Sequence, residues 1–406
     1  MIVVKGGVTT PKGFLASGVK AGIKKSGRAD LALLYSEVPA IASGVFTTNV
    51  FKASPVRISI ANLRNKTHQA VIVNSGNANC ANGKQGDKDA FMMASFIAKT
   101  MELARSEVLV ASTGIIGHRL PVRKIEDKVP ELLSALSVKG GSDFAAAIMT
   151  TDTVKKEVGV KIKLGGAVVS IGGAAKGVGM IHPYMKTGGH ATMLGFLTTD
   201  VSISKACLEA ALSEAVEDSF NMVSVDGDMS TNDSLFILAN GLAGNSRISS
   251  KGKDYSVFVG ALKFACVSLA KMLARDGEGA TKLIEITVTG SKDADSARRI
   301  ARKISTSNLL KCAIFGEDPN WGRVAAAAGS SGVDFDPNKA DIYLGPAKVL
   351  SNGSSMKSFD KERVRKYFKA KDVFIKLDLK SGKHSASAWT CDFSKEYVAI
   401  NSEYST

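Results

Sequence analysis

The part of the sequence most able to carry out chemistry is a glycine-rich segment at residues 172–200, GGAAKGVGMIHPYMKTGGHATMLGFLTTD. Its glycines suggest a phosphate-binding loop, but Lys176 follows an alanine and precedes a glycine, so GxxxxGK[ST] is broken, and GxGxxG is absent. Glycine here favours the close approach of backbone to backbone or to a small substrate. On residue types alone, this segment indicates a suggestive loop and nothing more.

The cysteines and histidines do not have the spacing of a metal site. The five histidines are scattered, and no two of the five cysteines form a CxxC pair. An odd number of dispersed cysteines also argues against a disulfide framework. The sequence therefore predicts neither a metal site nor structural disulfides. The cysteines are Cys80, Cys207, Cys266, Cys312 and Cys391.

The net charge of +15 limits the classes of partner. Such a charge fits nucleic acid, a membrane surface or acidic small substrates. The densest basic stretch, residues 360–372, interleaves acidic residues and is typical of a solvated helix face, and no zinc-finger, RRM or KH motif accompanies it. No apolar run approaches the roughly 18 residues of a membrane span, and the first residues lack a leader pattern. We therefore expect a cytoplasmic protein that binds neither nucleic acid nor membrane.

Several strands can be located from short apolar runs. Residues 70–74 and 108–111 are apolar and are each followed by a polar loop, which predicts buried strands. Alternation over residues 373–379 predicts a half-buried strand. A turn at residues 381–383 then leads to residues 387–391, and together these segments predict a β-hairpin.

Helices are expected between these strands. Apolar residues recur at i, i+3, i+4 and i+7 over residues 208–216 and 262–273, and the second of these helices should end before Gly277. A further helix is expected to run through residues 87–103. The alternation of strands and helices predicts a mixed α/β protein with several sheets.

The glycine-rich segment also carries a family resemblance. GGAAKGVGMIHP followed by ATMLGFLTTD resembles the self-cleavage motif of the ornithine acetyltransferases, or glutamate N-acetyltransferases. The resemblance covers essentially the whole chain, through motifs that recur in the family's order: VNSGNAN, ASTGIIG, TTDTVKKE, FNMVSVDGDMSTND, DGEGATKLIE, FGEDPNWGR and YVAINSEYST. It implies acetyl transfer from N-acetylornithine to glutamate in arginine biosynthesis. The implied fold has a layered αββα core like that of threonine-nucleophile hydrolases, with a second α/β lobe.

The resemblance implies that the chain cuts itself between Ala191 and Thr192. Thr192 would become the nucleophile, and its freed α-amine, with a pKa of about 8, could accept the hydroxyl proton. The α chain, residues 1–191, would form the N-terminal lobe with the oxyanion hole. The β chain, residues 192–406, would carry the nucleophile, the C-terminal lobe and a docked tail. The two chains would stay associated, as a heterotetramer of two α and two β chains.

The same resemblance implies the roles of other residues. Thr113 and Gly114 would form the oxyanion hole, because a hydroxyl and a backbone N–H are suitable donors. The expected substrate-binding residues, besides Thr192, are Thr150, Lys176, Glu278, Asn401 and Thr406. Lys176 suits a substrate carboxylate and Glu278 a substrate amine. No cofactor is implied, although acetyl-CoA could serve as a second acetyl donor.

The sequence departs from the family pattern near the expected cut. The family usually has HPNMATML, whereas this chain has HPYMKTGGHATML, with Tyr184 in place of asparagine and five extra residues at 186–190. Family spacing counted from Lys176 leads to Thr187, whereas the downstream match leads to Thr192. The ten consecutive matching positions downstream favour Thr192.

Two other functions remain open from the sequence. A hydrolase or aminopeptidase with the same nucleophile would pass the acyl group to water. Alternatively, the extra residues 186–190 could prevent cleavage and leave a protein that only binds its ligand.

Overall fold

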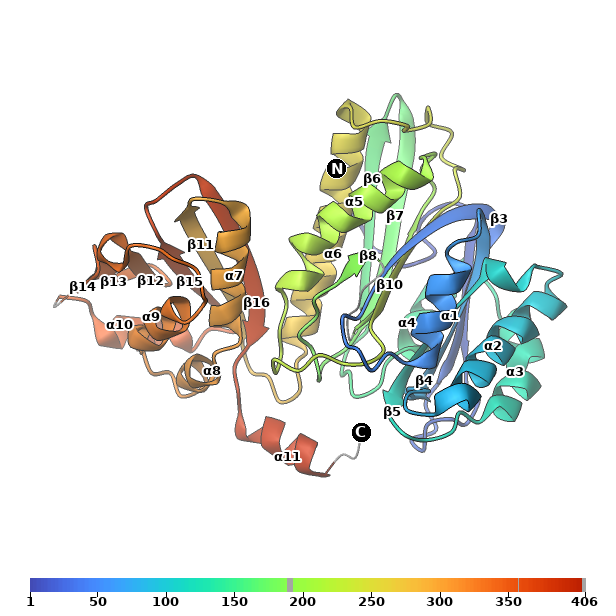
Figure 1. The fold of residues 1–406 in the computed structure, drawn as a ribbon, viewed down its shortest axis with the longest axis horizontal. Coiled ribbons are helices and arrows are strands. Elements are labelled where there is room, and N and C mark those ends of the chain that lie inside the picture. The colour runs from blue at the N-terminus through green and yellow to red at the C-terminus, as the bar shows by residue number, and fades with distance from the viewer. Residues whose placement is uncertain (188–192, 357, 404–406) are drawn as a thin grey trace.

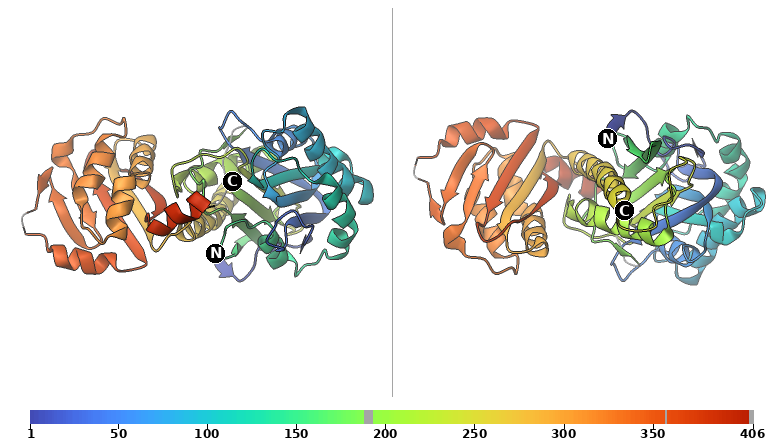
Figure 2. Two further views of the ribbon diagram at one scale, coloured as in Figure 1. Left: turned by 90° about the horizontal axis from the view of Figure 1, so that it is seen from below. Right: turned by 90° about the horizontal axis from the view of Figure 1, so that it is seen from above.

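The computed structural model describes residues 1–187, 193–356 and 358–403. The chain forms two lobes joined beside one long helix, and a short C-terminal helix returns beneath their junction (Figures 1 and 2). The larger lobe contains a ten-stranded sheet, and the smaller lobe a six-stranded sheet.

The ten strands of the larger lobe are shared between two packed layers, because β3 runs through both. The first half of β3 pairs with β2 and β4, its second half pairs with β10 and β8, and its register shifts between Tyr35 and Ala40. Pro39 lies in this shift, where a missing N–H costs no ladder hydrogen bond. The strands are β1 (Ile2–Val4), β2 (Phe14–Val19), β3 (Leu31–Phe46), β4 (His68–Asn77), β5 (Val108–Ile115), β6 (Lys156–Leu164), β7 (Ala167–Lys176), β8 (Lys186–Thr187), β9 (Leu194–Thr199) and β10 (Ser234–Ala239).

Helices cover the outer face of each layer. Alternate side chains of β7, β9 and β10 pack on α5 and α6, and those of β4 and β5 pack on α2 and α3. The helices of this lobe are α1 (Ser54–Asn62), α2 (Gly83–Thr100), α3 (Val122–Ser134), α4 (Gly141–Ala147), α5 (Lys205–Glu217) and α6 (Lys253–Arg275), with short 3₁₀ turns η1 (Arg105–Glu107) and η2 (Phe220–Met222). Helix, sheet, sheet and helix therefore follow one another, and the predicted αββα core is confirmed.

The space between the two layers is filled by the inward-facing side chains of both. Phe196 lies at its centre, with its ring 5.0 Å from that of Phe144 and 5.9 Å from that of Phe236. Along β9 and β10 the neighbouring positions, Leu197 and Leu235, point instead to the helices. This alternation is the period of two expected for strands buried on both faces.

The smaller lobe has the strand order β14-β13-β12-β15-β11-β16. Its strands are β11 (Leu283–Ser291), β12 (Asp341–Leu344), β13 (Ala347–Ser351), β14 (Ser354–Ser355), β15 (Asp372–Asp378) and β16 (His384–Cys391). Its helices are α7 (Ala294–Ser305), α8 (Asn308–Phe315), α9 (Trp321–Gly329) and α10 (Lys361–Phe368), with the turn η3 (Pro337–Lys339), and α11 (Lys395–Glu403) follows the last strand.

The predicted hairpin between residues 373–379 and 387–391 is wrong, although both strands exist. β11 lies between β15 and β16, parallel to the first and antiparallel to the second. The connecting turn passes over the end of β11, where Ser381 N–H donates to Gly290 O at 2.7 Å. Gly382 lies so close that a Cβ there would come within 2.2 Å of Ser291 O. A short turn therefore joins two strands that are not neighbours.

The spatial division of the molecule differs from the expected division into chains. β9, β10, α5 and α6 all follow residue 192, yet they belong to the larger lobe. The two lobes separate after α6, near residues 276–282, rather than at residue 191. A cut before Thr192 would therefore fall inside the larger lobe, and both products would contribute strands to one sheet.

The other predicted elements agree with the structure. β4, β5, α5 and α6 contain the segments expected to form them, α2 ends at Thr100 rather than at residue 103, and α6 ends at Arg275, before Gly277. Among the described helices, only α6 is long and apolar enough to cross a membrane. It is a core helix, since it packs against α5, β6, β7 and β16 at the junction of the lobes.

We predict that Phe196→Ala lowers the free energy of unfolding by about 3–5 kcal/mol, because it leaves a cavity between the two layers. Phe374→Ala is the matched control, since that side chain is 52% exposed, and it should cost less than about 1 kcal/mol. Urea unfolding measures both values. Equal losses in the two variants would contradict the central role of Phe196.

Candidate active site

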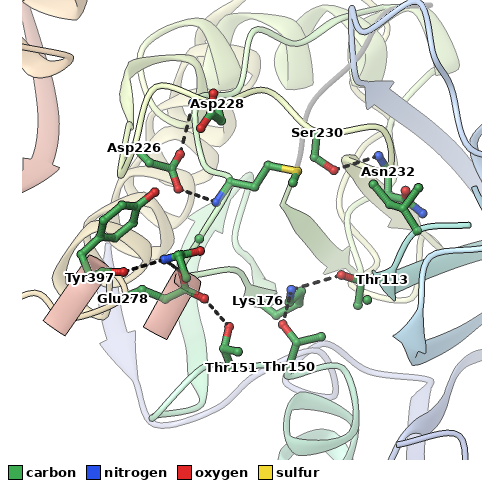
Figure 3. A pocket seen from close by; sticks show the side chains of 15 residues that line it. Thr113, Thr150, Thr151, Lys176, Asp226, Asp228, Ser230, Asn232, Glu278 and Tyr397 are labelled. Carbon is green, nitrogen blue, oxygen red and sulfur yellow. Dashed lines mark hydrogen bonds between the residues drawn. The ribbon is translucent and has the colours of Figure 1, made fainter. Parts of the chain in front are cut away.

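One pocket of about 140 Å³ brings together residues from distant parts of the chain (Figure 3). It lies where the ends of β5 and β7 meet the loops at residues 150–154 and 226–232, and where α11 returns to the larger lobe. Six residues expected from the sequence line it: Thr113, Gly114, Thr150, Lys176, Glu278 and Asn401. Ala191, Thr192 and Thr406, also expected there, lie outside the described residues.

The expected oxyanion-hole residues lie near the end of strand β5, whereas the sequence predicted a strand that ends before them. Thr113 and Gly114 pair with β4 at an irregular register around Asn77. Gly114 has a φ of 131°, and a Cβ there would come within 2.3 Å of the Gly76 carbonyl carbon. Only glycine is accommodated in this conformation and this space. Thr113 and Gly114 thus line the pocket side by side.

Lys176 is a buried cation at the end of β7. Its Nζ donates to Thr150 Oγ1 at 2.8 Å and to Thr113 Oγ1 at 3.2 Å. Burial lowers the pKa of Lys176, and the negative charge of Asp152 partly opposes that shift. Because Thr113 Oγ1 accepts from Lys176, the hydroxyl proton of Thr113 is free to be donated into the pocket.

A buried ion network beneath the pocket fixes these groups. Asp152 accepts from Thr150 N–H at 3.0 Å, from Gly177 N–H at 2.7 Å and from Lys156 Nζ at 2.7 Å. Lys156 also pairs with Asp276 at 2.6 Å. Burial alone would raise the pKa of Asp152, but the charges of Lys176 and Lys156 outweigh it and lower the pKa to about 2.

Glu278 connects the pocket to the C-terminal helix. Its Oε1 accepts from Thr151 Oγ1 at 2.8 Å, and its Oε2 accepts from Asn401 Nδ2 at 3.0 Å. Asn401 belongs to α11, in the terminal motif that the sequence resemblance included. The expected substrate-binding pair Glu278 and Asn401 is therefore in direct contact.

An acidic loop at residues 226–228 also lines the pocket, and it was not expected from the sequence. Asp226 accepts from the backbone N–H groups of Met180, Ile181 and Asp228 at 2.5, 2.9 and 3.1 Å. Burial raises the pKa of Asp226 despite these donors. Tyr397 of α11 lies beside it, and its pKa is raised by burial and by the charges of Asp226 and Asp228.

The remaining unexpected lining residues come mostly from motifs already visible in the sequence. Ser230, Asn232 and the two aspartates belong to FNMVSVDGDMSTND, and Tyr397 belongs to YVAINSEYST. Their presence in long family motifs was the available signal, but residue type alone did not separate pocket residues from loop residues. Within the described part of the chain, no three His, Cys, Asp or Glu side chains are grouped to hold a metal ion.

The segment that should carry the nucleophile is bracketed by paired strands. Ser234 N–H donates to Met193 O at 2.9 Å, so the chain is fixed to β10 immediately after residue 192. Thr187, the other candidate nucleophile, is in β8, which pairs with β3. A continuous row of paired positions crosses the sheet through Lys176, Leu194, Ser234, Phe46 and Lys186.

We predict that Asp152→Asn destabilises the protein in a pH-dependent way. The pKa of Asp152 is lowered from 3.8 to about 2, so its contribution is present above pH 4 and lost as the pH falls through 2. The shift corresponds to about 2 kcal/mol. Urea unfolding between pH 7 and pH 2.5 should show the gap between wild type and variant closing at the acid end.

Asp127→Asn, on the exposed surface of α3, is the control and should show no such gap. A gap for Asp152→Asn that stays constant from pH 7 to pH 2.5 would show that charge is not the source of the stabilisation.

Comparisons with known proteins show which family the chain belongs to. A model of the ArgJ family matches residues 15–406. The "Arginine biosynthesis bifunctional protein ArgJ" of Dehalococcoides mccartyi (strain CBDB1) is 50% identical over 407 residues, covering 100% of this chain and 98% of that protein. The protein of the same name from Symbiobacterium thermophilum is 48% identical, covering 99% of each.

A solved structure of the Mycobacterium tuberculosis ornithine acetyltransferase, complexed with ornithine, is 40% identical. It covers 46% of this chain and 99% of that chain, with a TM-score of 0.43. The match of the family model over nearly the whole sequence, together with relatives of similar length at about half identity, shows that the chain belongs to the ArgJ family.

Proposed function

We propose that this chain transfers the acetyl group of N-acetylornithine to glutamate, in arginine biosynthesis, through an acetylated Thr192. Membership of the ArgJ family and the names of its relatives support the reaction. The observation that carries the proposal is the convergence of six dispersed residues on one pocket. Donors for an oxyanion, a buried cation and carboxylates for substrate amines lie within that pocket.

Among the described residues, those of the oxyanion hole should contribute most to stabilising the transition state. When the Thr192 hydroxyl attacks the acetyl carbonyl, negative charge develops on the carbonyl oxygen. Gly114 N–H and the Thr113 hydroxyl would donate to that oxygen. Lys176 holds the Thr113 hydroxyl in the required orientation, because its Nζ donates to Thr113 Oγ1. The C–N bond to ornithine then breaks, the leaving nitrogen takes a proton, and an acetyl ester remains on Thr192.

The second half-reaction reverses the first with a different amine. The α-amine of glutamate attacks the ester carbonyl, the C–O bond to Thr192 breaks, and the amine proton returns to the threonine oxygen. The same donors stabilise the oxyanion in both directions. A single pocket that binds donor and acceptor in turn requires ping-pong kinetics.

The sheet register supports Thr192 rather than Thr187 as the nucleophile. Four strand spacings separate the backbone of Lys176 from that of Lys186, which is about 19 Å at roughly 4.8 Å per strand. Thr187 is the next residue in β8 and therefore belongs to the same distant strand. Thr192 is bonded to Met193, which precedes the strand paired directly with the end of β7.

Self-cleavage before Thr192 would supply the base. An amide nitrogen cannot accept the hydroxyl proton, whereas a free α-amine with a pKa of about 8 can. The products, residues 1–191 and 192–406, would stay together because both contribute strands to the ten-stranded sheet. We further propose two copies of each chain per assembly, a cytoplasmic location, and acetyl-CoA as a second acetyl donor.

Incubation with N-acetylornithine alone tests the function. We expect one equivalent of ornithine to be released and one acetyl group to be added to the 192–406 chain. Adding glutamate should then remove that group as N-acetylglutamate, and initial-rate lines should run parallel. Continuous release of acetate without glutamate would indicate a hydrolase instead, and intersecting lines would exclude the ping-pong order.

Two variants make this assay specific to the pocket. Thr113→Val removes one oxyanion donor at nearly constant volume and should lower kcat about 100- to 1000-fold. Thr187→Val makes the same change in β8 and should leave kcat unaltered.

A further inference from the structure

Three carboxylates line the pocket, and they differ in the hydrogen bonds that they accept. Asp226 accepts from three backbone N–H groups, and Glu278 accepts one hydrogen bond at each oxygen, from Thr151 and Asn401. Asp228 also lines the pocket, and its side chain has no hydrogen bond or ion pair to any other residue that the structure describes. Its charge is therefore available to a ligand.

Hydrogen bonds within the acidic loop fix where Asp228 lies relative to the reacting groups. Its backbone N–H donates to Asp226, which in turn holds the backbone of Met180 and Ile181. Figure 3 shows Asp226 and Asp228 on one side of the pocket and Lys176, Thr113 and Thr150 on the other. A substrate whose α-nitrogen reacts beside Thr113 would extend its far end toward the acidic loop.

The two amino acids of the proposed reaction differ mainly at that far end. Ornithine and its N-acetyl derivative end in an ammonium group, whereas glutamate ends in a carboxylate. Both amino acids use one pocket in turn, so a charged side chain at the far end interacts differently with each of them. A carboxylate attracts the ammonium and repels the second carboxylate.

We propose that Asp228 is a specificity-determining residue that recognises the distal charge of the substrate. This inference rests on the proposed function. Asp228 strengthens binding of the donor with its distal ammonium and weakens binding of the acceptor with its distal carboxylate. One exposed side chain thus sets the balance between the two half-reactions.

The expected size of the effect follows from exposure. A charge-assisted hydrogen bond can be strong, but Asp228 is exposed and solvent screens its charge. We therefore expect roughly threefold to tenfold changes rather than the hundredfold changes of a buried pair.

Asp228→Asn tests the proposal because it removes the charge and keeps the shape. The rate constant kcat/KM for N-acetylornithine in the first half-reaction should fall about threefold to tenfold. The value for N-acetylnorvaline, a donor of the same length without the ammonium, should stay within about twofold. The value for glutamate in the second half-reaction should rise. Asp127→Asn, an exposed aspartate on α3 outside the pocket, should change none of these values.

Calorimetry with ornithine and norvaline separates this inference from the proposed reaction, because binding needs no turnover. Wild type should prefer ornithine over norvaline, and Asp228→Asn should reduce that preference threefold to tenfold. If wild type transfers no acetyl group, the proposed reaction fails, while the binding ratio still decides the role of Asp228. An unchanged ratio, or an equal loss for charged and neutral ligands, would overturn the inference.

Discussion

The arrangement of the pocket depends on one buried carboxylate, that of Asp152. It binds the backbone on both sides of the pocket floor, at Thr150 and at Gly177, and it pairs with Lys156. Lys156 in turn holds Asp276, two residues before Glu278. A buried ion network is retained only when its members are fully satisfied, and this one has donors on every side. This network fixes the oxyanion donors, the ammonium group of Lys176 and the carboxylate of Glu278 relative to one another.

The second constraint is the path of β3 through both layers of the core. Its two halves connect the sheet that ends at Thr113 with the sheet that ends at Lys176. The Phe196 cluster between the layers then sets the distance between these strand ends. The pocket therefore forms where the two layers of the ten-stranded sheet end side by side, and the returning helix α11 closes it with Asn401.

The elements that sequence patterns predicted well are those whose signal is local. Apolar periodicity was enough for α5 and α6, and the layered core followed from the family resemblance. The hairpin at residues 381–383 failed because β11, about ninety residues earlier, inserts between its strands, and no local pattern reports such long-range pairing. The acidic loop was missed for a related reason: the bonding of Asp226 and the free charge of Asp228 become visible only in three dimensions.

The central claim is that Thr192 becomes the nucleophile once the chain is cut before it. Intact mass and N-terminal sequencing of the purified protein test this claim most directly. The account predicts two fragments, residues 1–191 and 192–406, the second beginning TMLGF. A fragment beginning TGGHA would show that spacing from Lys176 governs the cut, despite the distance of β8 from the end of β7. An uncut chain of 406 residues that still transfers acetyl groups would contradict the requirement for a freed amine.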